Sequence, residues 1–155
     1  MSQIKTRFVQ DIATLELVRK KLGLAAKYYP GFYRWWDIKV LPGILSGQRF
    51  VCLAYSSDIL AGIMVLKNTK EKKISSLYVF PEFRDQGVGT ALIQVAMRVL
   101  RTNTPVISVP EPLETAFTPL LQSFGFQEKL RYPDYYMTGI TEIAYNGYLT
   151  KEMTE

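Results

Sequence analysis

The segment Lys73–Leu100, KISSLYVFPEFRDQGVGTALIQVAMRVL, decides the fold of this chain. It begins with a run of β-branched, aliphatic and aromatic residues that predicts a short buried strand. Pro81 ends that strand, because proline has no N–H for a sheet ladder and restricts the residue before it. The chain turns at Arg84–Gly89, and from Thr90 apolar residues recur at helical spacing. The segment therefore predicts a strand, a tight glycine-bearing loop and a long helix.

The loop in the middle of this segment favours binding of a phosphate. Gly87 and Gly89 allow positive φ and a close approach of the backbone to a ligand. The helix that follows offers unpaired N–H groups and the positive end of its dipole, and Arg84 adds a positive charge. The loop is neither a Walker A loop nor a dinucleotide fingerprint, because the third glycine of GxGxxG is missing. From spacing alone, a tight turn without a ligand stays open as the alternative.

In its strand–loop–helix context, the segment resembles the acyl-CoA signature of the GNAT superfamily, the acyl-CoA-dependent N-acyltransferases. The signature [RQ]-x-x-G-x-[GA] is met by Arg84, Gly87 and Gly89. The preceding strand has the form hydrophobic-x-Val-x-Pro, met by Leu77, Val79 and Pro81. The resemblance implies that the loop amides hold the CoA pyrophosphate and that the strand orients the acyl group. It assigns acetyl-CoA as co-substrate, no metal, and the binding residues Leu77, Tyr78, Val79, Arg84, Asp85, Gln86, Gly87, Val88, Gly89 and Thr90.

Composition limits the class of protein. The 155 residues, 48% hydrophobic and 21% charged, predict one domain over residues 1–155. No signal peptide and no apolar run near 18 residues is present, and Cys52 is the single cysteine, so we expect a cytoplasmic protein with no membrane partner. Cys52 is interpreted as an inert core thiol. The absence of histidine excludes His-based catalysis and ordinary zinc sites.

The net charge of +5 suits an anionic cofactor or substrate. No basic cluster dominates, so we do not expect a nucleic acid partner except a tRNA acting as substrate.

The predicted fold class is α/β, or α+β in stricter usage: a GNAT-like central mixed, mostly antiparallel sheet flanked by helices. The resemblance implies that the strands bearing Leu77–Val79 and Val106–Val109 splay apart to admit the pantetheine arm. The aromatic cluster within Tyr28–Leu45 is interpreted as core packing of a short helix, with an acceptor-pocket wall or a dimer contact as the alternative. The other predicted elements are strands at Ile4–Val9, Arg49–Tyr55, Ile59–Lys67, Gln127–Arg131 and Glu142–Leu149, and helices after Asp11 and over Leu113–Phe124, with Pro119 near a first helical position.

The later part of the chain resembles the second GNAT motif, in which a helix ends in Gly-Phe, here Gly125-Phe126. Two departures concern catalysis. Leu121 stands where the family often has the tyrosine that protonates the CoA thiolate. Ser75 and Ser76 lie in the strand that often carries a carboxylate base. Neither the usual acid nor the usual base is therefore carried over.

Carboxylates and phenols near the central strands are the candidates to replace these groups. Glu111 and Glu114 follow one of these strands, and a carboxylate there could take an amine proton directly or through water if burial raised its pKa. A capping role is favoured for Glu114. Tyr132, Tyr135 and Tyr136 are predicted in a loop between the last two strands, where one phenol could act as acid. The catalytic candidates are Val79, whose N–H would polarise the acyl carbonyl, together with Glu111 and Tyr136.

These observations predict an N-acetyltransferase that transfers acetyl from acetyl-CoA to a primary amine of an unidentified acceptor by direct attack. The alternatives are a toxin-like GNAT acetylating aminoacyl-tRNA, an acyl-CoA-binding regulatory module without turnover, and a nucleic-acid-binding domain without cofactor. The sequence leaves open the acceptor, the acyl chain length and whether the protein forms a homodimer.

Overall fold

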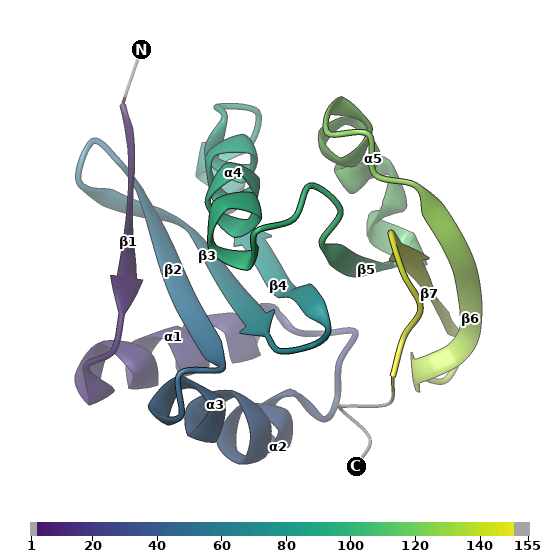
Figure 1. Cartoon of the computed structure of the whole chain (residues 1–155), viewed down its shortest axis with the longest axis horizontal. Helices are drawn as coiled ribbons and strands as arrows, with labels where there is room; N and C mark the ends of the chain where they lie inside the picture. The colour runs from purple at the N-terminus through teal and green to yellow at the C-terminus, as the bar shows by residue number, and fades with distance from the viewer. Residues whose placement is uncertain (1–2, 151–155) are drawn as a thin grey trace.

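The computed structural model describes residues 3–150 and contains one seven-stranded sheet in the order β1-β2-β3-β4-β5-β7-β6. Only β4 and β5 run parallel, and every other neighbouring pair is antiparallel. This confirms the predicted mixed, mostly antiparallel sheet flanked by helices (Figure 1). The elements are β1 Ile4–Val9, α1 Ile12–Ala25, α2 Phe32–Trp35, the π-helical turn η1 Trp36–Val40, α3 Leu41–Leu45, β2 Arg49–Ser56, β3 Ile59–Asn68, β4 Lys72–Val79, η2 Pro81–Phe83, α4 Val88–Leu100, β5 Val106–Pro110, η3 Glu111–Leu113, α5 Glu114–Ser123, β6 Glu128–Met137 and β7 Ile140–Tyr145.

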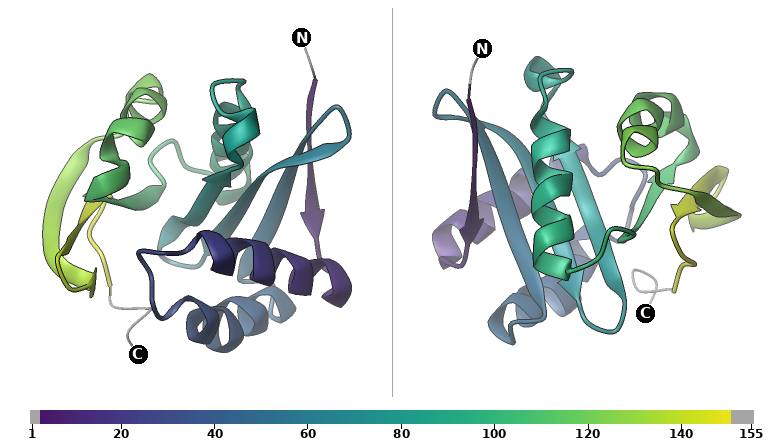
Figure 2. Two further views of the ribbon diagram at one scale, coloured as in Figure 1. Left: turned by 180° about the vertical axis from the view of Figure 1, so that it is seen from behind. Right: turned by 45° about the horizontal axis from the view of Figure 1, so that its top comes forward.

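Helices cover both faces of the sheet. Helices α1 to α3 lie on one face and α4 lies on the other (Figure 2). Side chains alternate along a strand, so Val51 and Leu53 of β2 pack with α1, whereas Cys52 and Ala54 pack on the α4 side. A sheet covered on both faces requires nearly continuous apolar strands, which explains the sequence of β2 and β3.

The aromatic cluster forms the core between the first helices and the sheet. Helices α2, η1 and α3 follow one another without a break, and Trp36 is fully buried. Phe32 and Trp35 are buried beside it and contact one another at 5.7 Å between ring centroids. The interpretation as core packing is correct for these three rings. Tyr29, just before α2, has a different environment that belongs to the candidate site.

Gly62 in β3 sets how closely α4 approaches the sheet. A Cβ at this position would lie 2.8 Å from Val88 Cγ1 and 3.2 Å from the carbonyl oxygen of Tyr78. The strand is also irregular here, because the register with β2 shifts between Ala54 and Tyr55 and leaves Ala61 as an extra residue. The bulge and close approach expected from a glycine within this strand are therefore both present.

Three predictions about the C-terminal third are wrong. Tyr132, Tyr135 and Tyr136 lie within β6, not in a loop between the last strands. The strand contains a long bulge, in which residues 133 to 136 lie opposite Thr141 alone. Pro133 is tolerated because β6 is the edge strand of the sheet. β7 begins at Ile140 and ends at Tyr145, so the last strand is also shifted from its predicted bounds.

The position of Pro119 is the third correction. It lies inside α5 and not near a first helical position. Its missing N–H leaves an interruption in the helix ladder. The neighbouring Thr118 hydroxyl donates to the carbonyl of Glu114 at 2.7 Å, which satisfies a helical carbonyl in the same turn.

We predict that Gly62→Ala destabilises the protein by about 1–3 kcal/mol, because the added methyl overlaps Val88 and the backbone of β4. Urea denaturation measures this change. The control is the double variant with Val88→Ala, which removes the methyl nearest the overlap. The two substitutions together should destabilise the protein by less than the sum of their separate effects, and strict additivity would contradict the packing argument.

Candidate active site

The loop between β4 and α4 presents free backbone donors to solvent. Within α4 the first hydrogen bond runs from Ala91 N–H to Gly87 O, so the N–H groups of residues 88 to 90 have no partner inside the helix. Gly87 takes φ of +86° and has no other heavy atom within 4 Å of its Cβ position. A helix of this length directs its positive dipole end to the same place. The loop therefore has the geometry of an anion site.

Packing between helices requires a glycine at position 89, which the loop motif alone does not reveal. A Cβ at Gly89 would lie 2.8 Å from Leu120 Cδ2, so the glycine lets α5 pack against the first turn of α4. Gly87 and Gly89 thus differ, because only Gly87 has open space around it.

Val79 at the end of β4 turns its amide toward β5. Phe80 N–H donates to Ala61 O at 2.9 Å, so Phe80 and Ala61 form a hydrogen-bonded pair of the β3–β4 ladder. In an antiparallel ladder such pairs alternate with pairs whose backbone groups point outward. Val79 lies opposite Gly62 and Leu77 opposite Met64, so the N–H and C=O groups of both residues point away from β3. The Val79 carbonyl accepts a hydrogen bond from Arg84 Nε at 3.2 Å, which ties the loop to the strand.

Strands β4 and β5 part soon after they meet. They pair only at Lys73 with Val106 and at Ile74 with Ile107. Ser75 is an extra residue in β4, because the register with β3 shifts between Ile74 and Ser76. A bulge bends its strand and increases the local twist, which explains why pairing stops there. The predicted splay of these two strands is present, and we call this region the β4–β5 fork.

A small polar cavity lies at the fork. Its volume is about 20 Å³, room for one water molecule. Ser75 Oγ and Trp35 Nε1 are buried without a hydrogen-bond partner among residues 3–150. The cavity is lined by Tyr29, Trp35, Lys73, Ser75, Ser108, Tyr136 and Glu142.

Glu142 of β7 is the central group of this cavity. It is 2% exposed, and its Oε2 accepts from Ser108 Oγ at 2.7 Å and from Tyr29 OH at 2.8 Å. Tyr136 lies against Tyr29 with 5.3 Å between ring centroids. Lys73 of β4 is 5% exposed and lines the same cavity. The loop after α1, β4 and the hairpin of β6 and β7 thus bring a carboxylate, an amine and two phenols together.

Burial shifts the titration of these groups. It raises the pKa of Glu142, although the hydrogen bonds from Ser108 and Tyr29 and the charge of Lys73 oppose the change. It lowers the pKa of Lys73 and raises the pKa of both Tyr29 and Tyr136, with nearby Glu142 adding to the effect on each phenol. Both phenols therefore stay protonated at neutral pH. Groups with environment-shifted pKa values in a cavity are characteristic of active sites.

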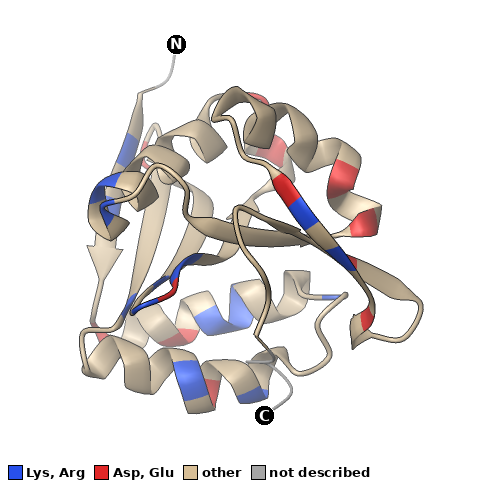
Figure 3. Ribbon diagram, turned by 45° about the vertical axis from the view of Figure 1, so that its right-hand side comes forward, with Lys and Arg blue, Asp and Glu red and all other residues tan. Residues whose placement is uncertain are grey.

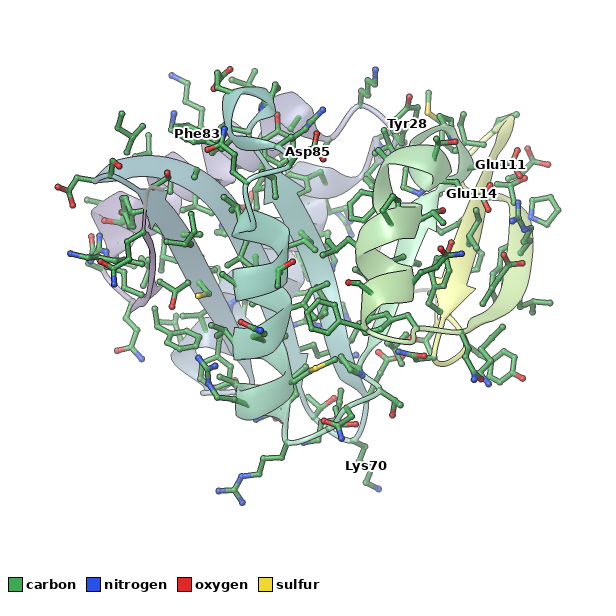
Figure 4. The ribbon with its side chains drawn as sticks, turned by 90° about the horizontal axis from the view of Figure 1, so that it is seen from above. Tyr28, Lys70, Phe83, Asp85, Glu111 and Glu114 are labelled. Atoms are coloured by element: carbon green, nitrogen blue, oxygen red, sulfur yellow. The ribbon has the colours of Figure 1, made fainter. Side chains whose placement is uncertain are left out.

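The predicted catalytic candidates fall in different places. Tyr136 lines the cavity and Val79 lies on β4 beyond the bulge, but Glu111 is on the surface with its side chain 51% exposed. The Glu111 carboxylate pairs with Arg131 at 3.1 Å, and Glu114 and Glu128 pair with the same guanidinium. Figure 3 shows acidic and basic residues along η3, α5 and β6, and in Figure 4 Glu111 and Glu114 lie together at the right-hand side, apart from Asp85 of the loop before α4.

Two further side chains bear on catalysis. Leu121 is buried in the core at α5, so no hydroxyl is available at that position. Cys52 is fully buried, and burial raises the pKa of its thiol to about 11, so the inert core thiol expected from the sequence fits. Among residues 3–150, no group of three or more His, Cys, Asp or Glu side chains is placed to hold a metal ion.

The family model of the GNAT acetyltransferase domain matches residues 38–148, which include β2 to β7 and both sides of the fork. This chain belongs to the GNAT acetyltransferases. They are acyl-CoA-dependent N-acetyltransferases, so the family expected from the signature loop is confirmed. A search of curated protein sequences gives no match.

Solved structures share the fold of this GNAT acetyltransferase. A GNAT-family protein from Desulfovibrio desulfuricans is 16% identical over 92% of this chain and 97% of its own, with a TM-score of 0.70. The PaiA N-acetyltransferase of Thermoplasma acidophilum in complex with coenzyme A is 20% identical over 94% and 99%, with a TM-score of 0.63. An acetyltransferase of Bacillus subtilis in complex with CoA is 16% identical over 95% and 100%, with a TM-score of 0.65.

Sequence reasoning did not predict that Glu142, Lys73 and Tyr29 of this GNAT acetyltransferase line one cavity. One signal was present: Glu142 is a carboxylate inside a strand whose neighbours Ile143, Ala144 and Tyr145 are buried. A charge in such a strand is rare unless it has a partner. Its partners come from β5 and from the loop after α1, which sequence spacing does not reveal.

None of the helices within residues 3–150 is long and apolar enough to cross a membrane.

We predict that Glu142 makes the protein lose stability as pH rises. Burial raises the pKa of Glu142 in the folded state above its value of 4.5 in the unfolded chain, so the folded state binds more protons between the two values. Relative to Glu142→Gln, wild type should therefore become less stable as pH rises above 4.5, by at most about 1.4 kcal/mol per pH unit. Chemical denaturation from about pH 3 to 8 measures the difference.

Glu128→Gln is the control with the opposite sign. The pKa of Glu128 is lowered by its hydrogen bond to Arg131, so wild type should gain stability over this variant as pH rises toward 4.5. A difference between wild type and Glu142→Gln that does not change with pH would contradict the buried position of this carboxylate.

Proposed function

We propose that this protein transfers acetyl from acetyl-CoA to a primary amine, which attacks the thioester directly at the β4–β5 fork. The observation that carries the proposal is the outward-facing backbone of β4, because Leu77 and Val79 offer N–H and C=O groups on the side where β5 has diverged from β4. An extended pantetheine arm can add to such an edge as a strand does. The family and the CoA complexes of structural neighbours support the choice of co-substrate.

The loop before α4 fits the pyrophosphate of CoA. The uncapped N–H groups of residues 88 to 90 and the open space at Gly87 leave the backbone accessible to phosphate oxygens. Arg84 contributes a positive charge beside them while its Nε remains on the Val79 carbonyl. The proposed binding residues are those of the signature: Leu77, Tyr78, Val79, Arg84, Asp85, Gln86, Gly87, Val88, Gly89 and Thr90.

Acetyl-CoA supplies an activated acyl carbonyl, and the chain positions and polarises it. The Val79 N–H is the proposed donor to the carbonyl oxygen, where a fixed backbone dipole stabilises the developing negative charge. Tyr136 lines the cavity, and because burial raises the pKa of its phenol we assign it a hydrogen-bonding role. A phenol that holds its proton so tightly does not readily give it to a thiolate. Glu111 is the weakest of the candidates, because Arg131 already holds its carboxylate at the surface.

Calorimetric titration with acetyl-CoA, followed by thiol release with a panel of amines, tests this function. We expect binding of one molecule per chain and acceptor-dependent thiol release. The panel should contain a polyamine, free lysine, a peptide N-terminus and an aminoacyl-tRNA. Binding without thiol release for any amine would favour a regulatory module, and no binding of acetyl-CoA would exclude the proposed function.

We predict that Gly87→Glu abolishes acetyl-CoA binding, because its carboxylate would occupy the helix N-terminus and repel the pyrophosphate. The fold should survive, because no heavy atom lies within 4 Å of the position that the Cβ would take. The variant should lose only about 1–2 kcal/mol of stability, because its side chain stands on a backbone with positive φ. Calorimetry and thermal unfolding measure the two effects separately.

Gly47→Glu is the matched control. Gly47 also has positive φ, at +79°, and open space, but it lies in the turn between α3 and β2. It should suffer the same backbone strain and bind acetyl-CoA as wild type does. Equal affinities of the two variants for acetyl-CoA would contradict the assignment of the loop before α4 as the pyrophosphate site. Gly89→Glu is less informative, because its side chain would also displace Leu120.

A further inference from the structure

We propose that Glu142 is the general base of the reaction and that it takes the proton of the acceptor amine through one water molecule held in the cavity at the β4–β5 fork. This inference rests on the proposed function and identifies the proton acceptor that the signature strand lacks. Ser75 and Ser76 occupy the positions of that strand where a carboxylate was expected, so a carboxylate base has to come from another element. Glu142 reaches the same cavity from β7.

Glu142 is fixed in one orientation by groups from two other segments. Both of its hydrogen bonds, from Ser108 of β5 and Tyr29 of the loop after α1, end on Oε2. Oε1 has no hydrogen bond to any of the described residues, so it can accept one from a molecule in the cavity. A buried carboxylate held in this way loses little further freedom when it accepts a proton. Ser108 and Tyr29 are thus positioning residues for Glu142.

The cavity itself has the size and the partners of a water site. Its volume of about 20 Å³ accommodates a single water, which needs two to four polar neighbours. Ser75 Oγ and Trp35 Nε1 are buried and lack a partner among the described residues, although such groups are almost always satisfied. A water here can accept from the indole N–H and donate to Glu142 Oε1 and Ser75 Oγ. One molecule thereby satisfies both groups.

Lys73 is the other ionisable group that could act as base. It enters the cavity from β4, and burial lowers its pKa. Among the described residues, the other polar groups that line the cavity with Glu142 are the hydroxyls of Ser75, Ser108, Tyr29 and Tyr136 and the indole N–H of Trp35. As an ammonium, Lys73 has no lone pair to accept a proton, and its charge favours the carboxylate form of Glu142. The arrangement therefore assigns proton acceptance to Glu142 and charge balance to Lys73.

The proton balance of the transfer is simple. An acceptor amine arrives as an ammonium ion and passes one proton to the water, which passes one of its own to Glu142. The neutral nitrogen forms a bond to the acetyl carbon, and the bond from that carbon to sulfur breaks. A second proton leaves the nitrogen and ends on the departing thiolate, which becomes the free thiol. Glu142 then returns its proton to solvent.

The test compares two small acceptors with acetyl-CoA by thiol release: n-propylamine, which is protonated at neutral pH, and methoxyamine, which is mostly unprotonated. Glu142→Gln should lower kcat/KM for propylamine by about 10²- to 10⁴-fold. The loss for methoxyamine should be at least tenfold smaller, because this amine arrives without the extra proton. Affinity for acetyl-CoA should stay within twofold of wild type. Glu128→Gln, a Glu-to-Gln change on the outer strand, should behave as wild type for both amines.

The pH profile separates Glu142 from Lys73. Wild-type kcat/KM for propylamine should fall as pH drops through the pKa of Glu142, and Glu142→Gln should lack this limb while Lys73→Met keeps it. Tyr29→Phe should move the limb to higher pH, because it removes a hydrogen bond that stabilises the carboxylate. Loss of the limb in Lys73→Met alone, or a Glu142→Gln variant within threefold of wild type, would overturn the assignment. Equal losses for the two amines would show a structural role.

Two measurements do not depend on turnover. An infrared difference spectrum between wild type and Glu142→Gln should show a protonated carboxyl band that persists above the ordinary pH range of glutamate. A high-resolution crystal structure should place a water within hydrogen-bond distance of Glu142 Oε1 and Ser75 Oγ. An empty cavity would refute the water route. Acetyl-CoA binding without thiol release by wild type would instead refute the proposed function.

Discussion

The irregularity at Ser75 is the constraint on which the site depends. One extra residue in β4 changes the direction of the strand just after its two paired positions with β5, at Lys73 and Ile74. Beyond that point, the two strands cannot complete a parallel ladder. Leu77 and Val79 are left with backbone groups directed at the place where β5 would otherwise lie. A sheet that continued in register would have satisfied these groups and closed the site.

The rest of the architecture holds this opening in place. Gly62 lets α4 approach β3, and Gly89 lets α5 approach α4, so the helices pack tightly on the same face of the divided sheet. The other face is filled by Phe32, Trp35 and Trp36, which hold the loop after α1 near the sheet. This loop carries Tyr29 to Glu142. The apolar core therefore positions the polar site, although it takes no part in the chemistry.

The polar cavity is unusual because it places a carboxylate where water is largely excluded. Isolated charges are unfavourable in such surroundings, and Glu142 is tolerated because two hydroxyls donate to it and Lys73 balances its charge. Natural sequences keep strained or costly features mainly at functional sites. The ion pairs around Arg131 are different, since they are exposed and solvent screens them.

The sequence by itself determined the parts that arise from local patterns. Strand, loop and helix of the segment Lys73–Leu100 lie close to where they were expected, because proline, glycine and apolar periodicity act within a few residues. The hairpin of β2 and β3 and the capping of α1 by Asp11 follow from equally local chemistry. The resemblance to the GNAT family was likewise carried by contiguous residues, and it was confirmed.

Only the tertiary structure decided which groups meet at the fork. Glu142 and Tyr29 are 113 residues apart, and Glu142 and Ser108 are 34 apart, so no spacing rule links them. The long bulge in β6 brings Tyr136 to the cavity, and the residues of that stretch alone suggested a loop. Glu111 follows β5 as predicted, but Arg131 draws it to the surface. Sequence thus determined the elements and the family, whereas strand divergence and long-range packing determined the chemistry of the cavity.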